Sequence, residues 1–301
     1  MERRGQPCYP RQGNQHVEEA EYTRLATLMN DSLTADQRSV PAYVRLRNVT
    51  KLYRSRRESV AAVSNVSLDI GTGEFVSILG PHGSGKSTLL SMVAGLIPVS
   101  SGTVAIAGRT VKKAQTEIGT VFPDPILLDS RSVLENVLLQ AEIRDLDEAE
   151  YRPRAERLIE LAGLKNYRDV QLFGLSPAHR QRVTVCRAFV HDPPLLLLDE
   201  PFGGLDAAHR QQAILDLQKV WMFSPKTVLY IASSVAEAVL LADRVVVLTA
   251  APGTVEAEVS IPVPRPRTVD PDALAALRPY AEQIRRALGE HNVHPEDQPA
   301  A

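Results

Sequence analysis

The chain has 301 residues, of which 44% are hydrophobic and 23% are charged, and its formal net charge is −2. This composition is ordinary for a soluble globular protein that buries one main core with a smaller subdomain. A near-neutral charge gives no sign of the basic surface that nucleic-acid phosphates call for, so a nucleic-acid partner is not expected. The two cysteines, Cys8 and Cys186, make no disulfide framework, which favours a reducing compartment.

Residues 1–42 form a polar arm rich in Arg, Glu, Gln and Asn, in which residues 21–30 are compatible with one short helix. The start of the arm lacks the apolar run of a secretory signal. The uncharged stretch from Ser87 to Gly108 is long enough to cross a bilayer, but Pro98 and the Ser100-Ser101-Gly102 run interrupt it. We therefore expect a helix followed by a strand there, with no membrane span.

Alternating β-branched segments begin at Tyr43, and residues 43–49 and 61–70 are predicted strands. Residues 74–80, EFVSILG, form a short apolar strand that leads directly into a glycine-rich loop and a helix. In α/β proteins, ligands bind at the carboxyl ends of such strands. The order of strand, loop and helix therefore predicts a ligand site at this loop.

The segment from about residue 123 to 193 has mostly helical periodicity and is expected to be a helical subdomain set into an α/β core. The core resumes with PLLLLDE at residues 194–200, whose unbroken leucines are typical of a buried parallel strand. Helix, strand, helix and strand then follow, which predicts a parallel sheet with crossover helices. Beyond the prolines of residues 262–266, a last amphipathic helix is expected. Its apolar positions are Leu274, Leu277, Ile284 and Leu288.

The glycine-rich loop has two glycines separated by four residues and followed by Lys and Ser, the pattern of a phosphate-binding loop. Its backbone N–H groups can point at phosphate oxygens beside a helix N-terminus, which favours anions. We expect Lys86 to neutralise the β- and γ-phosphates and the Ser87 hydroxyl to ligate Mg²⁺. A glycine-rich turn without function is the alternative, and the strand before and the helix after argue against it. The predicted nucleotide-binding residues are Gly80, Pro81, His82, Gly83, Ser84, Gly85, Lys86, Ser87 and Thr88.

An acidic pair, Asp199 and Glu200, ends the leucine-rich strand. Carboxylates at the end of a buried strand are unfavourable unless they meet a cation. Asp199 is expected to hold Mg²⁺ through water, and Glu200 is expected to be the catalytic residue that polarises an attacking water. Alone, such a pair is often a solvated turn, but together with the phosphate loop it indicates a nucleotide hydrolase site.

The phosphate loop, the run LLLLDEPFGGLD at residues 195–206 and the Leu175-Ser176 pair before a helix together resemble the ATPase subunit of an ABC transporter. The resemblance extends over about residues 43–288. The segments SVLENV, EPFG and EAVLLADR are similar to the nitrate, sulfonate and taurine importer branch. This resemblance implies an α/β fold of the P-loop NTPase class. Such a fold has a RecA-like core with a parallel sheet, an antiparallel β subdomain and an inserted helical subdomain.

The resemblance also implies an organisation and a setting. A nucleotide-binding domain would cover residues 43–262, with the helical subdomain at about 123–193, and residues 263–301 would form a C-terminal helix and tail. ATP and Mg²⁺ would be the cofactors. Transmembrane permease subunits and a second ATPase subunit would be the partners, and the protein would lie peripherally on the cytoplasmic face of the inner membrane.

Three further residues take roles from the resemblance. Tyr53 would stack on adenine, although an ordinary tyrosine at a strand end is the alternative. Ser176 would begin the helix that faces the nucleotide of the opposite subunit. Asp206 would lie in the loop that touches that subunit. These three residues complete the predicted binding set.

Three elements depart from the family's pattern. Pro123 stands where the family has a Gln after Val-Phe, and it offers no amide to Mg²⁺ or water. The run Leu175-Ser-Pro-Ala-His179 replaces Leu-Ser-Gly-Gly-Gln, so that a proline ring and a methyl group are added at a helix start. Ala232-Ser233-Ser234 replaces Thr-His-Asp, and Ser233 cannot reach or carry charge as the histidine does.

All three altered elements sense the γ-phosphate, whereas the elements that hold ATP are kept. This favours a subunit that binds ATP and has lost much of its hydrolysis. Three functions stay open: a transporter ATPase, a regulatory or scaffold subunit that binds ATP without turnover, and, more distantly, an ABC ATPase of DNA repair or translation. The retained Glu200 favours the first, and the missing Gln and His favour the second. A heterodimer with an intact ATPase would satisfy both observations.

Overall fold

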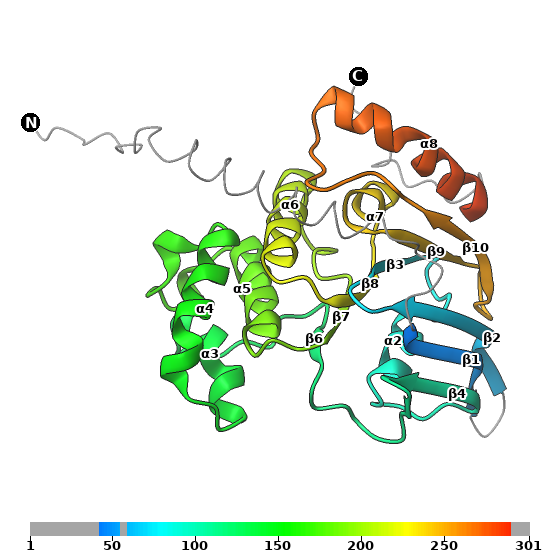
Figure 1. Ribbon diagram of the computed structural model, residues 1–301, viewed down its shortest axis with the longest axis horizontal. Helices are drawn as coiled ribbons and strands as arrows, with labels where there is room; N and C mark the ends of the chain where they lie inside the picture. Colours follow the sequence, from blue (N-terminus) through cyan, green and yellow to red (C-terminus); the bar gives the residue numbers. More distant parts are fainter. Residues whose placement is uncertain (1–41, 55–58, 290–301) are drawn as a thin grey trace, which may run out of the picture. The chain divides into compact units, whose positions relative to one another are not determined.

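The computed structural model describes residues 42–54 and 59–289 (Figure 1). The predicted arm apart from its last residue, the short helix considered at residues 21–30 and Cys8 lie outside the described residues. Within the described residues, no helix combines the length and the apolar composition that a membrane span needs. The stretch from Ser87 to Gly108 contains a helix and a strand, as expected.

The first sheet is antiparallel, with strand order β2-β1-β4-β5. Its long members are β1 (Ala42–Arg54) and β2 (Ser59–Gly71), joined by β4 (Ser101–Ile106) and the short β5 (Arg109–Thr110). Val44 and Leu46 of β1 are fully buried while the residue between them is exposed. One face of this sheet is therefore apolar and covers a core, as the alternating sequence predicts.

The second sheet has the order β10-β9-β3-β8-β7-β6. Five strands are parallel, and only the edge strand β10 pairs antiparallel, with β9. The strands are β3 (Phe75–Leu79), β6 (Gly119–Val121), β7 (Leu195–Asp199), β8 (Thr227–Ile231), β9 (Arg244–Leu248) and β10 (Val255–Ser260). Every residue of β3, β7 and β8 is buried because both faces of the sheet are covered. The predicted α/β class with parallel and antiparallel sheets is confirmed.

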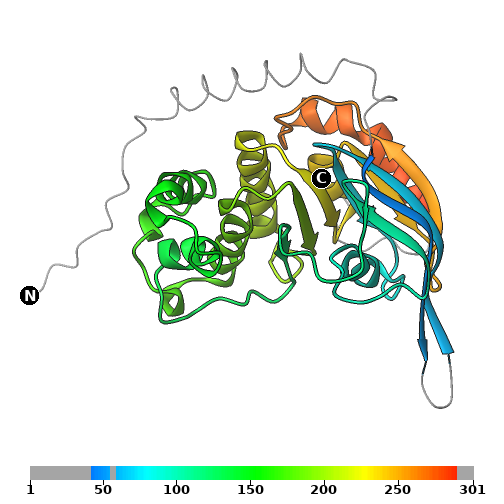
Figure 2. The same cartoon turned by 60° about the horizontal axis from the view of Figure 1, so that its bottom comes forward.

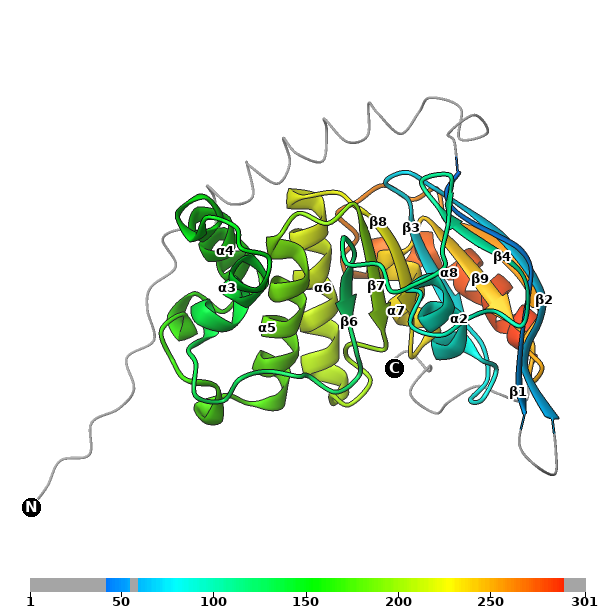
Figure 3. The same ribbon diagram turned by 90° about the horizontal axis from the view of Figure 1, so that it is seen from below.

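Helix α2 (Lys86–Val93) lies between the two sheets, as Figure 3 shows. Its Leu89 and Met92 belong to one apolar cluster with Val44 of the antiparallel sheet and Leu197 and Leu229 of the parallel sheet. The loop that joins the end of β3 to the start of α2 is therefore held at the carboxyl edge of the parallel sheet.

Three helices occupy the stretch between β6 and β7: α3 (Val133–Ile143), α4 (Glu148–Leu161) and α5 (Pro177–Val190). In Figures 1 and 2 these green helices lie on the side of the parallel sheet away from the blue antiparallel strands. The Ser132 side chain caps α3, and Glu135 returns a hydrogen bond to the Ser132 backbone in a capping box. The stretch is helical, as the periodicity predicts; the proposed domain boundaries stay predictions.

The chain ends with α6 (Ala207–Phe223), α7 (Val235–Leu241) and α8 (Pro271–Leu288). Arg267 is only 2% exposed, and its guanidinium donates to the carbonyl oxygens of Val239, Ala242, Ile261 and Val263. A buried cation of this kind is tolerated because its donors are satisfied. It fixes the segment that leads into α8.

One expectation from the sequence needs correction, and three strands were missed. Of the apolar positions expected on one face of α8, Leu277 and Ile284 are buried, but Leu274 is 43% exposed, so the core does not cover the first turn of this face. The strands β5, β6 and β10 were not expected. β5 and β6 span only two and three residues, too few to give a pattern, whereas β10 alternates apolar and polar residues and could have been found from that alternation.

Candidate functional site

The phosphate loop curls between β3 and α2 at the carboxyl edge of the parallel sheet. Gly85 precedes the helix with a φ of 83°, and a Cβ atom there would lie 2.6 Å from the Ala62 carbonyl oxygen. Gly253, from the loop after β9, comes closer still: its Cβ atom would lie 2.0 Å from the Ser84 carbonyl oxygen. The sequence predicted the glycines of the loop, but no local pattern marked Gly253 as a wall of the site.

Lys86 opens α2 and turns its ammonium back over the loop. Its Nζ donates to the carbonyl oxygens of Gly80 over 2.8 Å and Pro81 over 3.1 Å. Burial lowers the pKa of Lys86, and the nearby carboxylates of Glu200 and Asp199 act in the opposite direction. The structure therefore brings the loop's cation and the acidic pair into one site, as the sequence predicts for a phosphate-binding centre.

Asp199 ends β7 and is only 7% exposed. The Ser87 hydroxyl donates to Asp199 Oδ1 over 3.1 Å. Burial raises the pKa of Asp199; the hydrogen bond from Ser87 opposes this rise, while Glu200 adds to it. Such a carboxylate gains from a neighbouring cation. No cluster of three or more His, Cys, Asp and Glu side chains suited to a metal occurs in the described residues. A bound Mg²⁺ would therefore use the Ser87 and Asp199 oxygens with oxygens of its ligand, which suits its chemistry.

Glu200 stands in a strained backbone conformation. Its φ is 41°, in the left-handed region that a residue with a side chain rarely adopts. Its N–H donates to the Ile231 carbonyl oxygen of β8 over 3.2 Å, which ties the strained residue to the centre of the sheet. Strain of this kind persists where the surrounding structure enforces it, commonly at functional sites. It turns the chain sharply at the point where a catalytic carboxylate was predicted.

Tyr53 lies near the end of β1, beside the first turn of α2. Its hydroxyl is 3.5 Å from the Thr88 Oγ1, and the Lys51 Nζ is 5.2 Å from the centre of its ring. The side chain is 47% exposed, so about half of it is open to solvent next to the phosphate loop. Stacking on adenine stays a prediction that this position favours.

The other two predicted residues cap helices away from this centre. Ser176 caps α5 and accepts from the His179 N–H over 3.3 Å. Asp206 caps α6, accepting from the His209 N–H over 3.1 Å, while its Oδ2 lies 2.6 Å from His209 Nδ1. Among the described residues, neither makes a hydrogen bond to the phosphate loop. Their predicted roles toward an opposite subunit therefore stay predictions.

Comparison with known proteins decides the family. Residues 63–203 match the ABC transporter family. A taurine import ATP-binding protein of Burkholderia pseudomallei is 40% identical over 216 residues, which cover 71% of this chain and 82% of that protein. An uncharacterized ABC transporter ATP-binding protein of Methanocaldococcus jannaschii is 38% identical over 224 residues, covering 74% and 84%. This chain is an ABC transporter ATP-binding subunit.

Solved structures agree with this assignment. A dimeric ATP-binding cassette in a post-hydrolysis state, bound to ADP and Pi, is 32% identical, with a TM-score of 0.63. The match covers 73% of this chain and 99% of that chain. The predicted P-loop NTPase fold is confirmed, and so is the prediction that ATP with Mg²⁺ is the ligand of this ABC domain.

The ABC subunit's loop after β6 is held by α5. The Gln181 Nε2 donates to the Pro123 carbonyl oxygen over 2.8 Å. The Gln181 Oε1 is buried and has no hydrogen-bond partner among the described residues. Pro123 thus contributes a backbone oxygen to a contact inside the protein and no side-chain amide to the nucleotide site.

Ser233 is also engaged inside the ABC subunit. Its N–H and its Oγ both donate to Glu237 Oε2, over 2.6 and 2.8 Å, and the Tyr230 hydroxyl donates to the other carboxylate oxygen. Glu237 is fully buried, and burial raises the pKa of its carboxyl group. The Ser233 side chain therefore serves as a donor to a buried carboxylate at the start of α7.

Proposed function

We propose that this ABC subunit couples ATP to the import of a small anion of the nitrate, sulfonate or taurine type. The convergence of Lys86, Ser87, Asp199 and Glu200 at one edge of the sheet supports the ATP-dependent part. The substrate class is supported by the taurine import ATP-binding proteins among its relatives. The subunit would bind transmembrane permease subunits and lie peripherally on the cytoplasmic face of the inner membrane.

The residues of the site divide the chemistry among them. Lys86 would neutralise the terminal phosphates of ATP, and Ser87 with Asp199 would hold Mg²⁺. Bound Mg²⁺ supplies positive charge against the charge that develops on the phosphates. Glu200, held by its strained backbone, would orient and polarise the attacking water.

We further propose that this subunit hydrolyses ATP slowly. The Ser233 hydroxyl is committed to Glu237, and Pro123 presents only a carbonyl that Gln181 already binds. Neither position can supply the side-chain contact that the family's His and Gln make near the γ-phosphate. Since each well-placed contact to a transition state contributes about 10²-fold or more, losing both leaves binding intact and turnover low.

A regulatory or scaffold subunit without turnover is the second candidate, favoured by the same two residues. The retained Glu200 argues for a subunit that takes part in hydrolysis. Pairing with an intact ATPase satisfies both observations, because each of the two sites in such a heterodimer carries only part of the alteration. We therefore propose a heterodimer, although this fold also permits a symmetric pair.

The test of the nucleotide site is ATP binding by the purified chain in the presence of Mg²⁺. Lys86→Ala removes the loop's mobile cation and leaves mainly backbone N–H donors, so we expect it to abolish most of the binding. Isothermal calorimetry measures this directly. Lys226→Ala, outside the site in a pair with Asp192, is the matched control and should leave the affinity unchanged. Equal affinity in Lys86→Ala and the unmodified chain would refute the assignment of the loop.

A further inference from the structure

The phosphate loop packs against the backbone of two segments that are distant from it in the sequence. The first is β2, whose Ala62 carbonyl oxygen would lie 2.6 Å from a Cβ atom at Gly85. The second is the turn between β9 and β10, where a Cβ atom at Gly253 would lie 2.0 Å from the Ser84 carbonyl oxygen. The orientation of the peptide unit that joins Ser84 to Gly85 therefore depends on both segments.

The conformation of Gly253 does not itself require glycine. Its φ lies outside the left-handed region, so a residue with a side chain could adopt the same backbone conformation. An added Cβ atom would nevertheless overlap with the Ser84 carbonyl oxygen. Glycine is needed at this position because the backbone of the phosphate loop comes so close.

The turn that carries Gly253 is held in place by β2. The Gly253 N–H donates to the Ala62 carbonyl oxygen over 3.0 Å, and the Gly253 carbonyl oxygen accepts from the Ser64 N–H over 2.9 Å. Within the turn, the Thr254 N–H donates to Thr249 Oγ1 over 3.0 Å. Because these bonds fix the turn, we expect a side chain at position 253 to displace the phosphate loop.

The displaced group would be one that carries a donor of the nucleotide site. The Ser84 carbonyl oxygen belongs to the same planar peptide unit as the Gly85 N–H, so turning one turns the other. Gly85 has little room to follow, since the Ala62 carbonyl oxygen fills the space that a side chain of Gly85 would take. Backbone N–H groups of such a loop bind phosphate oxygens. A push on the Ser84 carbonyl would thus redirect one of these donors.

We infer that Gly253 is a positioning residue of the ATP site: the turn after β9 supports the Ser84 peptide, and this support aims the Gly85 N–H at the phosphates. The inference rests on the role proposed above for the phosphate loop. Gly253 acts through Ser84, and its effect is confined to the phosphates of the nucleotide, since the proposed adenine contact, Tyr53, comes from β1.

The test measures the binding of ATP and of inorganic tripolyphosphate, each with Mg²⁺, to the full chain by calorimetry. In Gly253→Ala both affinities should fall at least about tenfold, because a hydrogen bond to a charged phosphate is lost. The two losses should be of similar size, because both ligands use the same donor. Gly174→Ala is the matched control. Its Cβ atom would make only an ordinary contact with Val170, at 3.8 Å, so both affinities should stay unchanged.

A second variant loosens the turn without adding bulk beside the loop. Thr249→Val removes the hydroxyl that accepts from the Thr254 N–H and donates to the Pro252 carbonyl oxygen. Both affinities should fall about threefold, and this variant decides the outcome if Gly253→Ala does not fold. Urea unfolding of each variant without ligand separates a loss of stability from a loss of affinity in the folded protein.

Reduced stability with unchanged affinity in the folded variants would show that the turn moves and the loop does not, and would overturn the inference alone. A loss confined to ATP would also overturn it, because the change would then lie at the adenine. Undiminished ATP binding in Lys86→Ala, or no ATP binding by the unmodified chain, would overturn the assignment of the phosphate loop and the inference with it.

Discussion

At the scale of single residues, the site combines retained and altered chemistry. Lys86 and Asp199 lie where a phosphate and a divalent cation would meet them. Ser233 is a donor to the buried carboxylate of Glu237, a use that needs a small hydroxyl. Replacing Ser233 by the larger imidazole of histidine would remove this contact and could extend a side chain toward the nucleotide. The serine that replaces the family's histidine is therefore part of a local hydrogen-bond network, and a substitution at this single position can restore the histidine.

The residue-scale prediction concerns turnover. The isolated chain should hydrolyse ATP at least about 10²-fold more slowly than an ABC subunit with the intact Gln and His. Restoring both side chains, with Pro123→Gln and Ser233→His, should raise the steady-state rate of phosphate release at least about tenfold. Glu200→Gln in the restored protein should abolish the gain. A normal rate in the unmodified chain, lost in Glu200→Gln, would show that the altered residues do not limit hydrolysis.

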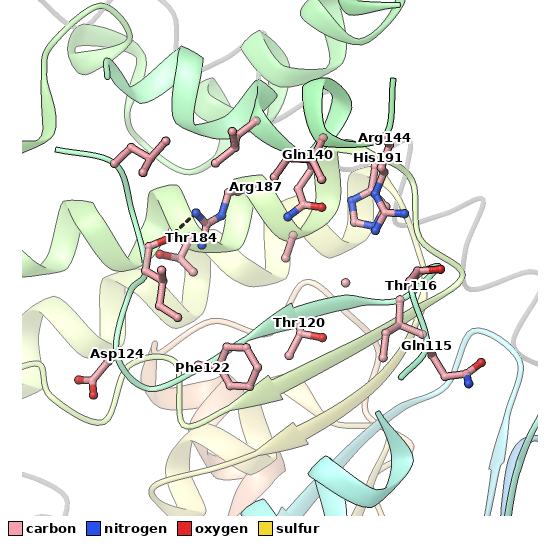
Figure 4. Close-up of a pocket in the computed structure, with 17 residues that line it drawn as sticks. Gln115, Thr116, Thr120, Phe122, Asp124, Gln140, Arg144, Thr184, Arg187 and His191 are labelled. Atoms are coloured by element: carbon pink, nitrogen blue, oxygen red, sulfur yellow. Dashed lines mark hydrogen bonds between the residues drawn. The ribbon is translucent and has the colours of Figure 1, made fainter. Parts of the chain in front are cut away.

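At the scale of elements, α5 has an altered start at Ser176 and a half-buried imidazole, His191, at its other end. Its first residues, Ser176 to Ala178, form the altered start that would face an opposite subunit, and His191 lines a groove beside β6 (Figure 4). Pro177 suits the first helical turn, where no N–H is needed, so the altered start is still a stable helix start. The helix dipole at the other end favours a charged imidazole by at most about 2 kcal/mol. Burial outweighs it, since the pKa of His191 is lowered to about 4.

A pH prediction follows for this helix end. Because the folded pKa of His191 is about 4 and that of an unfolded histidine is about 6.5, the unfolded chain takes up the proton first as the pH falls. Stability should therefore be complete above about pH 6.5 and decrease toward about pH 4. The full shift corresponds to about 3 kcal/mol, which partial exposure reduces to about 1–2 kcal/mol. Urea unfolding at about pH 7 and about pH 4.5 measures the difference.

His191→Gln removes the titrating group while keeping a polar side chain, so its unfolding free energy should fall less between the two pH values. His82→Gln, at an exposed position of the phosphate loop, is the matched control and should follow the unmodified chain. If His191→Gln lost as much stability as the unmodified chain, burial of this imidazole would not be the cause.

At the scale of the whole molecule, the altered residues at positions 123, 177 and 233 affect how two ATPase subunits would pair. In an ABC pair each ATP lies between the phosphate loop of one subunit and the Leu-Ser helix of the other. Two copies of this chain would place Pro123 and Ser233 opposite the altered start of α5 in both sites. With an intact partner, each site would carry only part of the change, and the pair could still cycle.

We therefore predict that the transporter expressed from its own operon contains one copy of this chain and one copy of a second ATPase. Mass measurement of the intact complex distinguishes the two compositions. Co-expression without the second ATPase gene is the control and should yield a complex of lower ATPase activity. Two copies of this chain and no other ATPase in the purified transporter would contradict the heterodimer.

The phosphate loop, the leucine-rich strand and the α/β alternation were predictable from the sequence. Each is encoded by neighbouring residues: glycines at fixed spacing before Lys86, an unbroken apolar run before Asp199, and helical and strand periodicity around them. The family followed from the same motifs. Local patterns of this kind can be read from the sequence because the backbone conformations that they require are set within a few residues.

The tertiary structure decided what depends on residues distant in the chain. Gly253 packs against Ser84, the Arg267 guanidinium donates to four carbonyl oxygens, and the three-residue strand β6 forms only at the edge of an existing sheet. Arg144 and His191 carry no shared motif, and they meet because α3 and α5 pack together. Their burial is a property of that packing, since burial is settled only when separate elements come into contact.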